Sequence, residues 1–164
     1  MSNDDTLRRT MIGKRYTVKG YVITPYELTV KALDEDRRSL NQTTQEIKLE
    51  PLKLIYKNWY AHQGSKGSSF VELAGQNPIY YESKLPQTLN HRYILEDIPY
   101  GLIPMASFLE KFGAANKNII SIINMACMTL GVDLYKHEQA RTLKTLGLAE
   151  KSSEDIIDYI TDRS

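Results

Sequence analysis

The stretch that decides the fold is Ile119-Ile120-Ser121-Ile122-Ile123-Asn124-Met125-Ala126-Cys127-Met128-Thr129-Leu130. Nine of these twelve residues are apolar, so a helix built from them is hydrophobic nearly all round. Gly131 follows directly and indicates a helix that covers about residues 116–130. The run is shorter than the ~18 apolar residues of a membrane span. We therefore expect it to be the central core helix of an all-α domain.

Helical patterns flank this central helix on both sides. All but the one at 137–146 begin at a proline or at a capping serine or threonine, and several end at glycine. Only residues 15–23 show the β-branched and aromatic alternation of a strand. We expect a compact multi-helix domain over residues 23–164, after an N-terminal extension at 1–22 with one short strand at most. The expected helices number about seven and cover approximately residues 25–47, 52–62, 70–76, 105–112, 116–130, 137–146 and 153–160.

Composition excludes several classes of function. The chain has 164 residues, which suits one domain, and a net charge of +1. Global charge therefore predicts no nucleic-acid partner and no membrane partner. The single cysteine, Cys127, rules out an intrachain disulfide, and its apolar neighbours favour a buried, inert thiol over a nucleophile. With no signal-peptide pattern and no apolar run of spanning length, we expect a cytoplasmic protein.

Most of the information on function lies in Asn90-His91-Arg92-Tyr93-Ile94-Leu95-Glu96-Asp97-Ile98-Pro99-Tyr100-Gly101-Leu102-Ile103-Pro104. The charged side chains of this 90–104 segment stand among Tyr, Ile and Leu, so we expect some to be half buried and to need partners. Two interpretations fit the pattern. The segment is either a site for a small charged ligand or a structural cluster of ion pairs.

Spacing distinguishes the two carboxylates of the 90–104 segment. Arg92 and Glu96 stand four residues apart, so on a helix they pair on one face. Asp97 is five residues from Arg92 and is left free for chemistry. Pro99 disfavours helical backbone at Ile98, so we expect any helix to end by about Asp97, where its carboxylate can face a cleft. The guanidinium of Arg92 is suited to hold a carboxylate through two hydrogen bonds.

Motifs for other chemistries are absent from the sequence. His62, His91 and His137 lack the spacing of metal ligands and no HExxH motif occurs, so we expect no metal site. Neither the GxSxG elbow of serine hydrolases nor the GxGxxG fingerprint of dinucleotide-binding folds is present. We therefore expect no cofactor site in this chain, and the 90–104 segment is the one strong candidate site.

The 90–104 segment resembles the signature of the octopine/nopaline (opine) dehydrogenase family, in its C-terminal helical domain. That signature reads roughly N-R-Y-x-x-E-D-[VI]-P-[YF]-G-L-[VI]-P. Two further stretches resemble the family in the right order. Ile23-Thr24-Pro25 with residues 31–34 is similar to the first helix of the domain, and Arg141-Thr142-Leu143-Lys144-Thr145-Leu146-Gly147-Leu148 is similar to its R-T-L-x-x-L-G-L ending. The resemblance covers roughly residues 20–160.

The resemblance implies a reaction. The family condenses the amino group of an amino acid with a 2-oxo acid such as pyruvate, using NADH or NADPH as the reductant. By resemblance, Arg92 holds the substrate carboxylate, and Asp97 is the acidic member of a catalytic His–Asp pair. The same resemblance gives substrate-binding or pocket-wall positions to His91, Tyr93, Glu96 and Tyr100.

Two departures from the family pattern limit this expectation. The N-terminal Rossmann domain, which binds NAD or NADP in the family, is absent. The catalytic histidine is absent too, because in the family it precedes the point where the match begins. His91 is not expected to replace it, since family members often carry a histidine there as well. The chain thus resembles half of an enzyme, as a separate domain, a truncated gene product or a split-enzyme subunit, and we expect no hydride transfer by this chain alone.

Two functions are consistent with these expectations. The first is the substrate-binding domain of an opine-dehydrogenase-like oxidoreductase, which acts on an amino acid and a 2-oxo acid together with a Rossmann-domain partner. The alternative is a non-enzymatic helical protein, derived from that domain, that dimerises or binds a small carboxylate. In either case an uncovered apolar docking surface favours self-association, so we expect a homo-oligomer.

Overall fold

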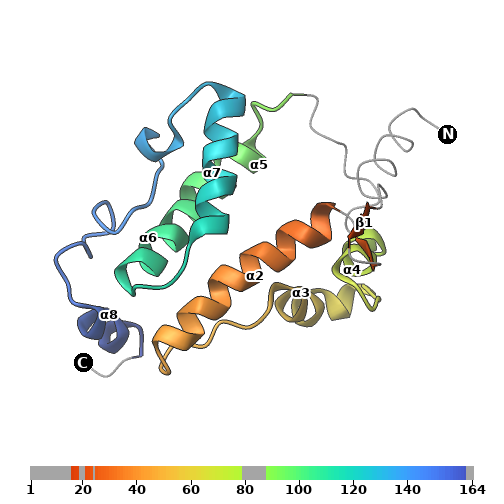
Figure 1. The fold of residues 1–164 in the computed structure, drawn as a ribbon, viewed down its shortest axis with the longest axis horizontal. Helices are drawn as coiled ribbons and strands as arrows, with labels where there is room; N and C mark the ends of the chain where they lie inside the picture. The colour runs from red at the N-terminus through yellow and green to blue at the C-terminus, as the bar shows by residue number, and fades with distance from the viewer. Residues whose placement is uncertain (1–15, 19–20, 24, 79–87, 162–164) are drawn as a thin grey trace. The chain divides into compact units, whose positions relative to one another are not determined.

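A computed structural model of the chain describes residues 16–18, 21–23, 25–78 and 88–161. Contacts between Cα atoms divide the chain into two compact units. Unit 1 contains residues 1–34 and 50–87, and unit 2 contains residues 35–49 and 88–164. Helix α2 (Pro25–Thr43) supplies its first part to unit 1 and its second part to unit 2 (Figure 1). Most of the expected 1–22 extension lies outside the described residues, so its boundary stays a prediction.

Unit 1 combines a short hairpin with two helices beyond α2. Strands β1 (Tyr16–Val18) and β2 (Tyr21–Ile23) pair antiparallel, so the region where we expected one strand at most holds two, each the partner of the other. Helix α3 (Leu52–Tyr60), the 3-10 helix η1 (Ala61–Gln63) and helix α4 (Phe70–Gly75) follow. Apart from this hairpin the regular structure of the described residues is helical, which confirms the all-α class.

The ring of Tyr56 joins α3 to α4. Its centre lies 5.0 Å from the centre of the buried Phe70 ring. Its hydroxyl accepts a hydrogen bond from Nδ2 of the fully buried Asn77 at 3.0 Å. This contact satisfies a polar group that burial would otherwise penalise.

Helix α4 begins at Ser69 with a reciprocal cap. The Ser69 hydroxyl accepts the N–H of Glu72 at 3.2 Å, and the Glu72 carboxylate accepts the N–H of Ser69 at 3.1 Å. The same carboxylate accepts both the hydroxyl and the N–H of Ser68, each at 2.7 Å. These bonds, that from the Ser68 hydroxyl above all, lower the pKa of Glu72 from 4.5 to about 2. The cap confirms the predicted start of this helix.

Unit 2 is built around helix α7 (Lys117–Leu130). Helix α6 (Ile103–Lys111) lies beside it (Figure 1). The π-helical turn η3 (Ile98–Leu102) contacts α5 (Arg92–Leu95), α6, α7 and the 3-10 helix η4 (Leu134–Lys136). Helix α8 (Ser153–Ile160) begins at Ser152, whose hydroxyl accepts the N–H of Asp155. The fully buried side chains include Ile103, Leu109, Ile119, Ile123, Leu134 and Ile156.

Burial of α7 is one-sided. Ile119 and Ile123 are fully buried, which confirms an apolar core helix at this place in the chain. Met125 and Met128, by contrast, are 60% and 79% exposed. Cys127 is only partly buried, although its apolar neighbours indicated a buried thiol. The composition of the helix indicates how apolar it is, but it does not indicate which face packs against other elements.

The helix predicted at 137–146 does not form. Instead the chain runs through η4 and then through turns. The hydroxyl of Thr145 accepts the N–H of Thr142 at 2.8 Å and donates to the carbonyl of Ala140 at 3.1 Å, and the Thr142 hydroxyl accepts the N–H of Thr145 at 3.3 Å. These side chains take the backbone groups that a helix would pair with one another.

A buried carboxylate fastens the second part of α2 to the start of α7. Asp36 is 1% exposed, and its Oδ2 accepts the N–H groups of Asn118 at 2.9 Å and Ile119 at 2.8 Å. Its Oδ1 accepts Nδ2 of Asn118 at 2.8 Å. The N–H groups of the first helical turn have no partner inside their own helix, and the helix dipole favours a negative charge there. Asp36 therefore caps the N-terminus of α7 and links it to α2.

Among the helices of the described residues, none combines the length and the apolar character that a membrane crossing requires.

The substitution Asp36→Asn tests this capping interaction. The amide group keeps the size of the carboxylate, but it removes the charge and one of the two acceptor oxygens to which Asn118 and Ile119 donate. We expect the free energy of unfolding to fall by about 2–4 kcal/mol in urea titrations followed by circular dichroism. The neighbouring Glu35 is exposed, and Glu35→Gln should change that free energy by less than about 0.5 kcal/mol. Equal effects of the two substitutions would contradict the role of Asp36.

Glu72 predicts a specific pH dependence. Its pKa is depressed in the folded state, so its stabilising contribution is fully present above pH 4.5 and is lost as the pH falls toward about 2. Melting temperatures measured across this window should fall more steeply for the native chain than for Glu72→Gln. Glu138 is exposed and serves as the control, because Glu138→Gln should leave the native slope unchanged.

Candidate functional site

Most of the 90–104 segment follows a helical path, which passes from the α-helix α5 through the π-helical turn η3 into the α-helix α6. Helix α5 begins after His91, whose Nδ1 accepts the N–H of Tyr93 at 3.3 Å. Asp97 has helical φ and ψ angles of −63° and −33°, and η3 follows it and leads directly into α6. Helix α5 ends at Leu95, which confirms the predicted helix end by about Asp97, but the non-helical backbone predicted at Ile98 is wrong. The proline that should have stopped the helix is accommodated in a π-helical turn.

Two prolines explain this turn and leave one carbonyl free. Pro99 has no N–H to offer the preceding turn, and helices commonly adjust to such a loss through a π-helical turn. Ile103 then donates its N–H to the carbonyl of Ile98, five residues back. Pro104, five residues after Pro99, has no N–H either. The carbonyl of Pro99 accepts instead the backbone N–H of Arg141 at 3.0 Å.

Three of the predicted site residues, Tyr93, Asp97 and Tyr100, are exposed. Tyr93 and Asp97 stand four residues apart on one face of the helical path before η3, and Tyr100 lies within η3. Ile98 and Pro99 lie buried behind them. We expected some charged side chains of the segment to be half buried. Arg92, Glu96 and Asp97 are all exposed, and only His91 is partly buried.

The predicted pair between Arg92 and Glu96 is confirmed, and it is weak. Nε of Arg92 lies 3.7 Å from Oε2 of Glu96, and the two side chains are 70% and 50% exposed. An exposed pair of this kind contributes about 0–1 kcal/mol, so a ligand carboxylate can displace Glu96 at little cost. Asp97 makes neither an ion pair nor a side-chain hydrogen bond with any residue that the structure describes. This geometry favours a ligand site over a structural cluster of ion pairs.

His91 has a structural task at this site. It caps α5, and its ring packs edge-on against Tyr93 with ring centres 4.5 Å apart. The same ring nitrogen that accepts the Tyr93 N–H is therefore occupied within the chain. The substrate contact that the resemblance implied for His91 stays a prediction.

Arg141 is the residue that sequence reasoning missed. Its guanidinium carbon lies 4.9 Å from the centre of the Tyr100 ring, within the range of a cation–π contact. The backbone bond to Pro99 brings it there from a distant part of the chain. Proline spacing alone did not signal this, because a regular helix would pair the Pro99 carbonyl with the N–H of Ile103, and only the π-helical turn moves that N–H to Ile98. Nothing in the sequence named the donor.

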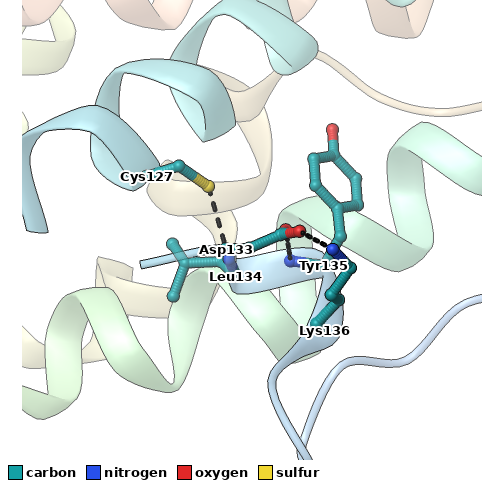
Figure 2. Close-up of polar contacts among 5 residues, drawn as sticks. All are labelled: Cys127, Asp133, Leu134, Tyr135 and Lys136. Atoms are coloured by element: carbon teal, nitrogen blue, oxygen red, sulfur yellow. Dashed lines mark hydrogen bonds and ion pairs between the residues drawn. The ribbon is translucent and has the colours of Figure 1, made fainter. Parts of the chain in front are cut away.

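A second group of titratable residues lies at the end of α7 and is structural (Figure 2). The Asp133 carboxylate accepts the N–H of Tyr135 at 3.1 Å and begins η4, and a hydrogen bond from Lys136 lowers the pKa of Asp133. Sγ of Cys127 accepts the N–H of Leu134 at 3.4 Å. Burial and the nearby Cys127 raise the pKa of the Tyr135 hydroxyl. These contacts fix the turn after α7 and converge on no common point.

A hollow of about 580 Å³ in unit 2 lies elsewhere. It is lined by the end of α2, the end of α6 and the start of α8, and none of its lining residues belongs to the 90–104 segment. The cleft that we expected Asp97 to face is therefore not this one. Within the described residues the site is an exposed face of the helical path.

The described residues do not fit a metal ion or a dinucleotide. They contain no group of three or more His, Cys, Asp or Glu side chains able to hold a metal. A dinucleotide binds where a parallel strand turns into a helix, and the one sheet within the described ranges is the antiparallel β1–β2 hairpin.

Comparison with known proteins gives a consistent result. Residues 24–130 match the family described as NAD/NADP octopine/nopaline dehydrogenase, alpha-helical domain. The chain is 27% identical over 128 residues to a protein named "Protein ocs" from Agrobacterium vitis, covering 78% of this chain and 34% of that protein. It is 28% identical over 92 residues to an "Opine dehydrogenase" from Arthrobacter sp. (strain 1C), covering 56% of this chain and 25% of that protein. The chain thus spans about a third or less of these relatives, and it belongs to the octopine/nopaline dehydrogenase family, whose alpha-helical domain it carries.

Proposed function

We propose that this chain is the substrate-binding domain of an NAD(P)-dependent oxidoreductase that reductively condenses an amino acid with a 2-oxo acid. The observation that carries the proposal is the family match over residues 24–130, which includes Arg92 and Asp97 on the exposed part of the 90–104 segment. In the overall reaction the amine adds to the ketone, water leaves to give an imine, and hydride addition gives a secondary amine. The relative from Arthrobacter carries the name of such an enzyme.

Arg92 supplies the carboxylate contact in this proposal. A guanidinium presents paired N–H donors that match the two oxygens of a carboxylate, and its charge persists at every relevant pH. The exposed partner Glu96 holds the guanidinium near the helix surface without neutralising it strongly.

Asp97 supplies the acidic group of the acid–base pair. Its carboxylate is exposed and has no ion-pair partner within the described part of the chain, so it can orient a histidine that arrives from elsewhere. Such a pair moves the protons that imine formation requires. The nicotinamide nucleotide, which supplies the hydride, is held in this proposal by a Rossmann domain outside residues 1–164, in the same or in a second chain.

A non-enzymatic role is the second candidate, and one observation favours it. Met125 and Met128 are strongly exposed on α7, and an exposed apolar surface favours self-association. In this case the chain is a homo-oligomer that binds a small carboxylate at Arg92 and performs no reduction. Reaction assays separate the two candidates, because only the first requires Asp97.

Binding of pyruvate tests the role of Arg92. We expect isothermal titration calorimetry to show that Arg92→Lys weakens pyruvate binding by about tenfold, since lysine keeps the charge but loses the paired donors. Asp97→Asn should leave the affinity within about twofold, because a neutral amide at that position removes no carboxylate contact. Arg38→Lys, at an exposed position of α2, is the matched control. If Arg92→Lys binds pyruvate as tightly as Arg38→Lys does, Arg92 is not the anchor.

Turnover is the second test. This chain alone should oxidise no NADH or NADPH in the presence of pyruvate and an amino acid, because the nucleotide site and the histidine lie outside it. Absorbance at the nicotinamide band measures the rate. Fusion to the part of the Arthrobacter relative that this chain does not match should produce turnover that Asp97→Asn abolishes. Turnover by the isolated chain, or turnover of the fusion without Asp97, contradicts the proposed function.

A further inference from the structure

The backbone carbonyl of Pro99 has two possible donors. In a regular α-helix it would accept the N–H of Ile103, which stands four residues further along the chain. In the structure Ile103 donates to Ile98 instead, and the Pro99 carbonyl accepts the N–H of Arg141 at 3.0 Å. Which of the two donors this carbonyl accepts therefore distinguishes a regular winding of residues 98–102 from the observed π-helical winding.

Either winding leaves one carbonyl of the turn without a donor from the helix, because Pro104 has no N–H. With the regular winding the unpaired carbonyl is that of Tyr100, four residues before Pro104. With the π-helical winding it is that of Pro99, five residues before Pro104. The proline at this position thus explains why the helix has a carbonyl to spare, but it does not determine which carbonyl that is.

The carbonyl left over by the observed winding lies in the core. The side chains of Pro99 and Ile103 are fully buried, and Ile98 is buried too. A buried carbonyl without a donor costs free energy comparable to a lost hydrogen bond. The π-helical winding therefore requires a donor from elsewhere in the protein, and Arg141 supplies it.

Arg141 has anchors of its own outside η3. The preceding residue, Ala140, is buried, and its carbonyl accepts the hydroxyl of Thr145 at 3.1 Å. The guanidinium carbon of Arg141 lies 4.9 Å from the centre of the Tyr100 ring. Residues 140–145 therefore contact two successive residues of η3, one through the backbone and one through a side chain, and their own turn holds them in place.

We propose that Arg141 is a positioning residue that holds η3 in its π-helical winding, so that residues 140–145 set the direction of the candidate site. Loss of the Arg141 bond lets the regular winding form. That change turns α5 against α6 by roughly the rotation of one helical residue, about 100°. Tyr93 and Asp97 precede η3 and turn with α5. A contact that moves residues 140–145 therefore acts on the site from outside it, and this inference does not depend on the reaction proposed above.

NMR identifies the carbonyl to which Ile103 donates, through the scalar coupling across the hydrogen bond between its amide nitrogen and the carbonyl carbon of Ile98 or Pro99. Pro104→Ala restores a helical N–H and removes the local obstacle to the regular winding. We expect Pro104→Ala alone to keep the coupling to Ile98, because Arg141 still occupies the Pro99 carbonyl. Pro104→Ala combined with Arg141→Pro, which lacks that N–H, should move the coupling to Pro99.

Matched variants separate the backbone of Arg141 from its side chain. Pro104→Ala with Arg141→Ala keeps the N–H, so the coupling should stay with Ile98. Circular dichroism checks each fold, and if Arg141→Pro unfolds the chain, Thr145→Val with Pro104→Ala decides, because it loosens the turn around Arg141 and should divide the coupling between Ile98 and Pro99. A coupling to Pro99 in Pro104→Ala alone overturns the role of Arg141, and so does a coupling to Ile98 only in the deciding variant.

Discussion

The buried carboxylate of Asp36 is the constraint on which unit 2 depends. Three hydrogen bonds from Asn118 and Ile119 satisfy it, and without them a charge that is 1% exposed could not be tolerated. Because the bonds run to the first turn of α7, they fix where that helix starts and how it is rotated against α2. That rotation puts Ile119 and Ile123 into the core and leaves the methionines of α7 outside. Helix α6 and the turn η3 then pack against the buried side.

The candidate site is built from backbone groups that regular helices would use up. Prolines in and after η3 leave the Pro99 carbonyl to Arg141, and the threonines of residues 142–145 prevent a helix that would carry Arg141 elsewhere. Both features have the same cause. A backbone group that loses its partner within a helix is free to bond to a side chain or to a distant segment. The family resemblance covered both segments, but only the structure shows that Arg141 meets Tyr100.

Sequence patterns were informative wherever the cause was local. The capping serines expected at the starts of α4 and α8 and the pair of Arg92 with Glu96 all connect residues within four positions of one another, and all three are confirmed. Asp36 could not be found in this way, because it stands in the charged run 34–38 and its partners lie more than 80 residues away. Pro99 was misjudged for a related reason, since its effect on the helix depends on the packing of η3 as well as on its own ring.

The π-helical turn has a consequence for how this segment can vary. Successive residues of a helix are rotated by about 100°, so any change in the number of residues in the turn rotates everything before it against everything after it. Before η3 lies the face with Tyr93 and Asp97, and after it lies the buried stripe of α6 that includes Ile103 and Ala106. The number of residues in η3 therefore sets the angle between the face that carries Tyr93 and Asp97 and the buried face of α6. A single inserted or deleted residue in η3 would therefore turn Tyr93 and Asp97 away from their present direction.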